Sequence, residues 1–261
     1  MIIRHNPIAA VGRVFLLFLT AIGRLVLFSW SILAQGIRPP YYPKQILRMI
    51  IEIGYYSLPV VGMTTLFTGA ALALQSNSGF ADFGAENSIP LIVALAITRE
   101  LGPVMAGLMV AGRIGAAFAA EIGTMRVTEQ VDALVTLSTN PFKYLLFPRI
   151  LAATLMLPCL VFVGDIIGIF GGYAVSVKAL HFAPMPYINN TWNFLTWFDV
   201  MTGLVKAGVF GFLVALMGCY HGYHSKGGAQ GVGTATTNAV VSASILILLS
   251  NYLITEAFFG I

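Results

Sequence analysis

Charged side chains are scarce in this chain. Asp, Glu, Lys and Arg make up 9% of its 261 residues, whereas soluble globular domains contain about 25% of them. So few charges could not keep a folded surface in water. The composition therefore excludes an ordinary cytosolic enzyme, a disordered chain and a nucleic-acid-binding protein.

Residues that carry catalysis or bind metals are equally few. Cys159 and Cys219 lie in apolar runs, where cysteine behaves as a small hydrophobic residue, and two such cysteines supply neither a disulfide framework nor zinc-ligand spacing. His221 and His224 could share a metal, but no other ligand lies near them in the sequence. The glycine-rich segment 227–234 does not match a phosphate-binding loop, and we expect a flexible loop there. We therefore predict a non-catalytic chain without a metal or cofactor of its own.

Apolar residues, in contrast, are abundant: 58% of the chain is hydrophobic and its mean hydropathy is +0.87. A membrane hydrocarbon core of about 30 Å needs about 20 mostly apolar helical residues. The sequence predicts an all-α polytopic membrane protein with an N-terminal region, 1–48, and a transmembrane domain, 49–261. The five predicted spans are approximately Ile50–Gln75, Ile89–Ala111, Ile150–Val177, Val200–Tyr220 and Ala235–Phe259.

The N-terminal region has a different pattern. Two short apolar runs, Val14–Ile22 and Leu25–Leu33, are flanked and interrupted by Arg13 and Arg24. Eleven residues at 100° each return these two arginines to the same face of a helix. An apolar helix with arginines along one edge is typical of a segment that lies in the headgroup region. A cleaved signal peptide is the alternative, and the prolines of 39–43 separate this segment from the first span.

The distribution of basic residues predicts the orientation. Loop 76–88 contains Asp82 and Glu86 but no base, and loop 178–199 contains only Lys178. The other loops and the N-terminal region are basic, which places the N-terminus inside and the C-terminus outside. The bases on the predicted inner side are Arg4, Arg13, Arg24, Arg38, Lys44, Arg48, Arg113, Arg126, Lys143, Arg149 and Lys226.

Two charged residues, Arg99 and Glu100, fall near the middle of the second span. Each costs about 2.5–3.5 kcal/mol at the centre of a membrane helix, so neither is expected to face lipid. Lys206 in the fourth span and Asp165 in the third are the candidate partners. These residues would form an interhelical ion-pair network, line a polar substrate cavity or switch, or do both.

Small residues recur at helix-packing distance in the third span. Gly164, Gly168 and Gly172 form a GxxxGxxxG run, and such rows let helix backbones approach closely. We expect this row to pack against another helix of the same chain rather than at a dimer interface.

The loop of residues 112–149 is the most informative stretch. Its core, Glu121–Leu134, predicts a short amphipathic helix within about 117–138. A compact charged helix between two spans suits the docking of a soluble partner, and a merely solvated surface helix is the alternative.

Three motifs between residues 99 and 134 resemble a known family. They are Arg99–Pro103, Ala111–Ala116 and Ala120–Leu134. They are similar to the MlaE/YrbE permeases, the membrane subunits of ABC transporters that work with MCE-domain proteins. The resemblance covers nearly the whole chain and continues through Asn140–Pro141, Pro148–Arg149, Gly168–Gly172 and Gly231–Val240.

The resemblance implies a homodimeric permease in the bacterial inner membrane, with the N-terminus cytoplasmic and the C-terminus periplasmic. Each subunit would have an N-terminal interfacial helix and about five spans. A cytoplasmic ABC ATPase would bind ATP and Mg²⁺, often together with a small STAS-domain protein, and an MCE-domain protein would bind on the periplasmic side. The implied substrate is phospholipid, moved between the inner and outer membranes to maintain outer-membrane asymmetry.

The resemblance also assigns roles to individual residues. Arg99, Glu100 and Lys206 match polar residues near the family's lipid cavity. Asn251 stands where many members have an acidic residue, so an ion pair at that position is in doubt, and Asp165 is the candidate to replace it. The stretch that matches the ATPase-coupling helix supplies Glu121, Gly123, Arg126, Glu129, Gln130 and Asp132.

Two other functions are consistent with the composition. An ion-coupled secondary transporter would use Asp165, Glu100 and Lys206 as a proton relay. A membrane enzyme acting on lipid headgroups would use His221 and His224.

Overall fold

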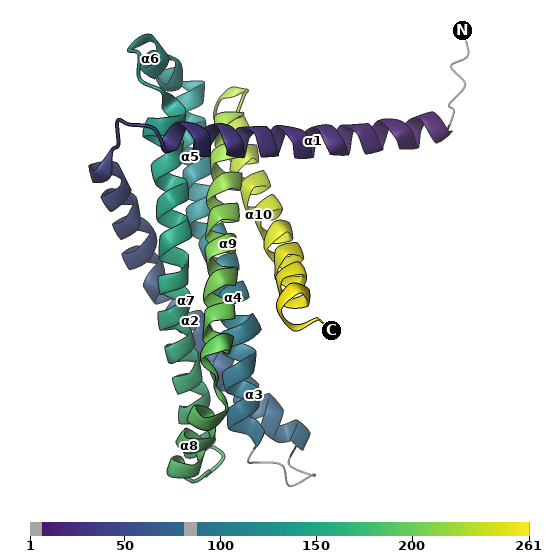
Figure 1. The fold of residues 1–261 in the computed structure, drawn as a ribbon, viewed down its shortest axis with the longest axis vertical. Helices are drawn as coiled ribbons and strands as arrows, with labels where there is room; N and C mark the ends of the chain where they lie inside the picture. Colours follow the sequence, from purple (N-terminus) through teal and green to yellow (C-terminus); the bar gives the residue numbers. More distant parts are fainter. Residues whose placement is uncertain (1–6, 81–87, 261) are drawn as a thin grey trace.

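The computed structural model describes residues 7–80 and 88–260, which form helices joined by short links and contain no strand (Figure 1). Arg4, Asp82 and Glu86, used above to predict orientation, lie outside the described residues. In the names that follow, α denotes an α-helix and η a π-helical turn. The elements are α1 Pro7–Gly36, α2 Pro43–Phe80, α3 Ile89–Ala96, η3 Ile97–Leu101, α4 Gly102–Val110, η4 Ala111–Gly115, α5 Ala116–Val127, α6 Gln130–Thr136, η5 Phe142–Leu146, α7 Phe147–Lys178, α8 Pro184–Phe194, α9 Trp197–Tyr223 and α10 Gly228–Phe259.

Six helical stretches of the described chain are long and apolar enough to cross a membrane. Five of them form the upright bundle in Figure 1 and correspond to the five predicted spans. The prediction of an all-α polytopic membrane protein is therefore confirmed. The six stretches are Phe15–Gly36, Pro43–Gly79, Ile89–Val127, Phe142–Lys178, Trp197–Tyr223 and Gly228–Phe259.

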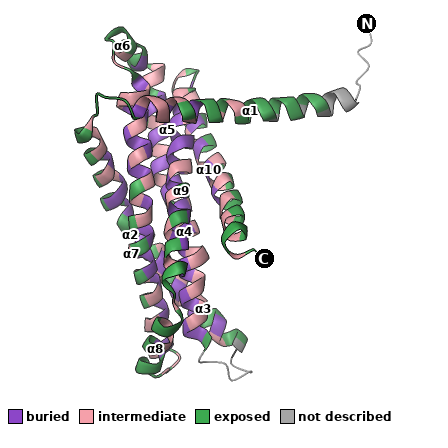
Figure 2. Ribbon diagram, in the orientation of Figure 1, coloured by how far each residue is buried: buried purple, intermediate pink, exposed green. Residues whose placement is uncertain are grey.

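The sixth stretch belongs to α1, which lies across one end of the bundle instead of along it (Figure 1). Most of α1 is exposed (Figure 2), but Phe28 and Ile32 are buried where α1 crosses the bundle. The Phe28 ring packs edge-on against Phe142 and Tyr220, with centroids 5.7 and 5.4 Å away. This transverse packing is the arrangement expected of an interfacial helix.

The second span is longer than predicted, and the expected loop from residue 112 is wrong up to Val127. The helical run continues through η4 and α5 because α2 accommodates Arg113. Nη1 of Arg113 donates to Oγ of Ser57 at 2.7 Å and to the carbonyl oxygen of Glu52 at 3.2 Å. Arg113, at which the sequence predicted the end of the span, is thus held within the helix by hydrogen bonds to α2.

The predicted single amphipathic helix Glu121–Leu134 is also wrong. Its first half is the end of α5, and α6 begins only at Gln130. Glu129 separates them in the left-handed region with φ 61°, a conformation that non-glycine residues adopt rarely and that a regular helix cannot contain. The chain therefore turns a corner in the middle of the expected coupling helix.

Two further segments differ from the prediction. Segment 227–234 is not a loop, because α10 begins at Gly228 directly after a turn in which Gly227 and Gly228 adopt φ of 88° and 70°. Segment 178–199 contains the short helix α8, which was not predicted. Two prolines, Pro184 and Pro186, stand in the first turn of α8 and obscured the helical pattern.

Glycines bring α2 and α7 into close contact, as the GxxxGxxxG run predicted. A Cβ atom on Gly69 of α2 would overlap the carbonyl oxygen of Gly168. A Cβ atom on Gly164 would press against Thr65 at 3.2 Å. The predicted packing of this row within one chain is therefore confirmed.

The predicted inner segments lie together in space. Helix α6 and the turn between α9 and α10 lie at the end of the bundle crossed by α1, and α8 lies at the opposite end (Figure 1). This grouping is what alternating spans require. The side of the membrane that each end faces stays a prediction.

Candidate functional site

The site begins with an irregularity in the second span, the π-helical turn η3. The amide of Gly102 donates to the carbonyl of Ile97, five residues earlier, instead of to Thr98. Pro103 has no N–H, so the carbonyl of Arg99 lacks its α-helical donor as well. Nζ of Lys206 donates to this carbonyl at 2.7 Å. A side chain of α9 thus replaces a backbone donor of η3.

Lys206 is fully buried, with no exposed side-chain area, and its ammonium group makes three hydrogen bonds. Besides the Arg99 carbonyl, Nζ donates to Oε1 of Glu100 at 2.7 Å and to Oγ1 of Thr255 at 2.8 Å. An ammonium group has three donors, so each finds an acceptor. The charge is compensated by the carboxylate of Glu100.

Lys206 belongs to a larger group of hydrogen-bonded side chains, which we call the polar cluster: Arg99, Glu100, Asp199, Lys206, Asn251 and Thr255.

Glu100 connects the second span to α10. Its Oε2 accepts a hydrogen bond from Nδ2 of Asn251 at 2.7 Å, and its Oε1 lies 2.9 Å from Oγ1 of Thr255. An acid at position 251 would place a second carboxylate against Glu100. The amide of Asn251 instead supplies a donor, so the contact forms here as a neutral–ionic hydrogen bond rather than as an ion pair.

Arg99 points to a different partner, Asp199 at the start of α9. Its Nε and Nη2 lie 2.7 and 2.5 Å from Oδ1 of Asp199. The guanidinium also lies 4.5 Å from the ring centre of Phe259, a cation–π distance. The Asp199 side chain is 1% exposed but that of Arg99 is 35% exposed. One face of this cation therefore remains accessible.

Asp165, the other predicted partner, is not paired. Its side chain is buried in α7 beside Gly102, where a Cβ atom would overlap Oδ1. Neither of its carboxyl oxygens has a hydrogen-bond partner in the part of the chain that the structure describes. Asp165 thus lies next to η3 without joining the polar cluster.

Sequence reasoning missed Asp199 and Thr255. Asp199 belongs to a capping box: Oδ2 accepts hydrogen bonds from the backbone N and Oγ1 of Thr196 at 3.0 and 2.7 Å. The pattern Thr-x-x-Asp before an apolar run could have indicated this helix start. Gly203, one turn later, lets α9 approach η3 so closely that a Cβ atom would overlap the carbonyl oxygen of Thr98.

The predicted coupling residues do not form one surface. Nη1 of Arg126 lies 2.5 Å from Oδ1 of Asp132, so an ion pair spans the corner between α5 and α6. Glu121 pairs with Arg149 of α7 at 2.8 Å. Gly123 is buried and packs near Ser225, whereas the side chains on the α6 side are exposed: Glu129, Gln130 and Asp132.

The two histidines contact groups on their own side of the bundle. Nε2 of His221 lies 3.0 Å from Oγ of Ser242, and Nδ1 of His224 lies 2.8 Å from the carbonyl oxygen of Tyr220. Within residues 7–80 and 88–260, no three His, Cys, Asp or Glu side chains are grouped as metal ligands would be.

The chain is similar to known permeases along its length. The family model described as "Permease MlaE" matches residues 46–257. A Rickettsia felis protein named "Probable ABC transporter permease protein" is 58% identical over 256 residues, which cover 98% of this chain and 99% of that protein. The Haemophilus influenzae "Intermembrane phospholipid transport system permease protein MlaE" is 34% identical over 258 residues, 98% of each chain. An Arabidopsis thaliana chloroplast protein, TRIGALACTOSYLDIACYLGLYCEROL 1, is 35% identical over 216 residues, 83% of this chain and 62% of that protein. The chain therefore belongs to the MlaE permease family.

Proposed function

We propose that this chain is the permease subunit of an ATP-driven transporter that moves phospholipids between the inner and outer membranes of a bacterium. The name of the Haemophilus relative, which matches the chain from end to end, supports the substrate and the inner-membrane location. The name of the Rickettsia relative supports the transporter class. ATP and Mg²⁺ would be bound by a partner ATPase.

The observation that carries this proposal is an accessible arginine beside a buried, fully paired lysine within the spans. Asp199 and the Phe259 ring hold the Arg99 guanidinium in place, and its exposed face can receive a lipid phosphate. Lys206 has no free donor, so its role in this conformation is to join η3, α9 and α10. Arg99 would contact the headgroup while Lys206 stabilises the packing behind it.

Helix α6 is the surface on which we place the ATPase. It projects beyond the bundle at the α1 end (Figure 1) and exposes Val135 and Leu137 by 58% and 74%. The exposed acids and amide of its first turn lie beside these apolar side chains. An apolar patch with a charged rim is typical of a protein interface. An MCE-domain protein would bind at the α8 end, and a STAS-domain protein would accompany the ATPase.

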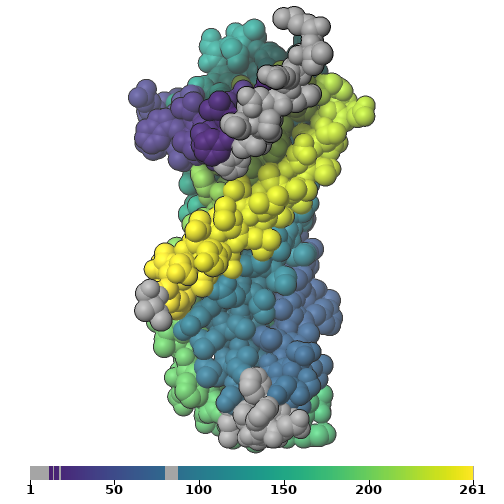
Figure 3. Space-filling model, turned by 90° about the vertical axis from the view of Figure 1, so that its right-hand side faces the viewer, coloured from purple at the N-terminus to yellow at the C-terminus, as the bar shows by residue number. Residues whose placement is uncertain are grey.

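Helix α10 is the surface on which we place a second copy of the chain. Figure 3 shows it running diagonally across one face of the molecule, with nothing covering it on this side. Its exposed apolar side chains recur at helical spacing, as expected of a face that contacts another helix. They are Val241, Ile245, Leu248, Leu249, Tyr252 and Leu253. The lipid cavity would lie between the two copies.

Gentle purification of the tagged chain from its native membrane tests the proposal. Mass spectrometry should identify an ABC ATPase, an MCE-domain protein and bound phospholipid in the eluate. A chain that elutes without an ATPase in mild detergent would contradict the proposal and favour an ion-coupled transporter, for which the unpaired Asp165 carboxyl would be the first residue to substitute.

A further inference from the structure

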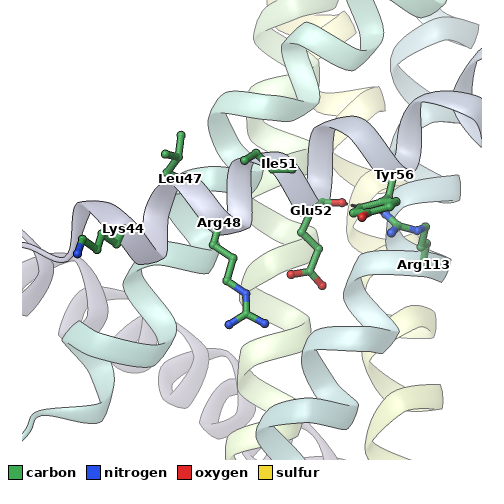
Figure 4. A pocket seen from close by; sticks show the side chains of 7 residues that line it. All are labelled: Lys44, Leu47, Arg48, Ile51, Glu52, Tyr56 and Arg113. Carbon is green, nitrogen blue, oxygen red and sulfur yellow. Dashed lines mark hydrogen bonds between the residues drawn. The ribbon is translucent and has the colours of Figure 1, made fainter.

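A second group of charges lies outside the polar cluster, in an open groove beside the first half of α2 (Figure 4). The groove has a volume of about 720 Å³. Three basic side chains, one acid, one tyrosine and two aliphatic side chains line it: Lys44, Arg48, Arg113, Glu52, Tyr56, Leu47 and Ile51.

The positive charge of this groove is not neutralised by the protein. Four ion pairs occur within residues 7–80 and 88–260, and Lys44 and Arg48 take part in none of them. Arg113 binds only neutral acceptors, Oγ of Ser57 and the backbone carbonyl of Glu52. Three bases against one carboxylate leave a net charge of +2. The groove therefore favours an anionic ligand.

A neighbouring crevice does not change this balance. It shares Arg48 and Glu52 with the groove and adds Glu121 and Arg149 at its inner wall. Nη2 of Arg149 lies 2.8 Å from Oε2 of Glu121, so these two charges compensate each other. The unpaired charges remain on the groove side, where Figure 4 shows Arg48 and Glu52 extending to the same side of α2.

The position of the groove identifies the ligand as a lipid. Helix α2 has 38 residues and is therefore about 57 Å long, whereas a hydrocarbon core is about 30 Å thick. Its first turns, which contain Lys44 and Arg48, lie at the end of the bundle that α1 crosses (Figure 1), and we therefore place them in the headgroup region. Leu47 and Ile51, 59% and 53% exposed, lie beside these bases and offer contact to an acyl chain.

We propose that this groove binds an anionic glycerophospholipid from the membrane leaflet on the α1 side. Lys44 and Arg48 contact its phosphate, and the Arg113 guanidinium, held by α2 and 5.8 Å from the Tyr56 ring centre, closes the deep end. Phosphatidylglycerol fits the charge, whereas phosphatidylcholine carries a compensating cation that the basic groove disfavours. This site goes beyond the proposed transport function, because it faces the outside of the bundle and not the polar cluster.

Native mass spectrometry of the purified full-length chain in detergent tests the site without any partner subunit. Phosphatidylglycerol and phosphatidylcholine with identical acyl chains serve as probes, and glycerol 3-phosphate serves as the soluble phosphate. We expect a preference for phosphatidylglycerol. A basic residue near an anionic lipid contributes about 1 kcal/mol, so Arg48→Gln should weaken phosphatidylglycerol binding about fivefold and weaken the binding of the zwitterionic phosphatidylcholine less, which reduces the preference.

Two variants separate a specific site from a general effect of charge or misfolding. Arg38→Gln removes an exposed arginine at the same end of the molecule but outside the groove, and it should retain the preference. Glu52→Gln removes the only acid of the groove and should strengthen phosphatidylglycerol binding, a gain that misfolding cannot produce. Equal binding by Arg48→Gln and Arg38→Gln would overturn the site. Displacement of the lipid by equimolar glycerol 3-phosphate would overturn its assignment to a lipid.

Discussion

At the scale of single residues, the polar cluster shows how charges are accommodated within membrane spans. Lys206 and Glu100 neutralise each other, and each remaining hydrogen-bonding atom of the ammonium group finds a partner. Arg99 keeps an exposed face because Asp199 binds only one side of it. The two cations therefore differ in accessibility: Lys206 is enclosed by the helices that it joins, whereas one face of Arg99 is open.

Lys206→Met removes the buried ammonium, so that Glu100 loses its cationic partner and the Arg99 carbonyl loses its donor. We expect a loss of stability of about 2 kcal/mol, less than for a wholly buried pair because Glu100 is 37% exposed. Thermal unfolding in detergent would measure it. The exposed Lys226→Met serves as the control, and an unchanged unfolding temperature in Lys206→Met would contradict this account.

Arg99→Ala should abolish lipid transport while the chain still folds and assembles, because Asp199 keeps its two hydrogen bonds from Thr196 when the guanidinium is removed. Lipid transport between reconstituted vesicles would measure the loss of activity, and size-exclusion chromatography would measure folding and assembly. Arg24→Ala on the exposed side of α1 is the matched control. Wild-type transport by Arg99→Ala would remove the headgroup role.

At the scale of elements, composition and apolar length predicted the bundle helices well, since a span needs a minimum number of apolar residues. The predictions were wrong where contacts between distant residues determine the structure. Arg113 seemed to end the second span, but Ser57 and the carbonyl of Glu52, more than fifty residues away, hold it within the helix. The pairing of Arg99 with Asp199 was missed for the same reason: a hundred residues separate them, and no local pattern links them.

Close approach of α9 to η3 depends on Gly203. Gly203→Ala would place a Cβ atom against the Thr98 carbonyl oxygen and separate the two elements. We expect a destabilisation of about 1–3 kcal/mol, measured as a lower unfolding temperature in detergent. Gly233→Ala in α10, where a Cβ atom meets nothing within 4 Å, should instead be neutral or slightly stabilising. Similar changes of unfolding temperature in both variants would show that helix propensity, and not the contact with Thr98, determines the effect of Gly203→Ala on stability.

The corner at Glu129 presents α6 to the proposed ATPase. Glu129→Lys reverses an exposed charge on that surface and should weaken ATPase binding or uncouple hydrolysis from transport. Co-purification of the ATPase and lipid-stimulated ATP hydrolysis would both report it. Glu256→Lys near the end of α10 reverses an exposed charge elsewhere and should leave both unchanged; an ATPase that binds and responds normally to Glu129→Lys would exclude this surface.

At the scale of the whole molecule, α10 is the least enclosed of the bundle helices (Figure 3). In a membrane, lipid tails are as apolar as leucine, so exposed apolar area alone does not hold a helix in place. Close packing and hydrogen bonds do so. The hydrogen bonds of Asn251 and Thr255 with Glu100 and Lys206 therefore help to fix the far half of α10, together with the contact of Arg99 with Phe259.

A disulfide cross-link tests the proposed dimer. Leu249→Cys, with Cys159 replaced by Ser and Cys219 by Ala, should yield a chain of twice the mass on a non-reducing gel after mild oxidation of native membranes. Phe170→Cys, at a position of α7 that is 60% exposed against 53% for Leu249, should remain monomeric. Cross-linking through position 170 and not through 249 would place the dimer contact on another face.

The hydrogen bond from Lys206 to the carbonyl of Arg99 limits how α9 and η3 can move relative to each other. The hydrogen bond of this carbonyl is completed by a different helix, so any separation of α9 from η3 would leave a bare backbone acceptor inside the membrane, where such a group costs several kcal/mol. We therefore expect α9 and the second span to move as one unit in the proposed transport cycle. Near its C-terminal end α10 is joined to that unit by the side-chain hydrogen bonds of Asn251 and Thr255, which water or a headgroup can replace, so we expect this half of α10 to be the part that opens and closes.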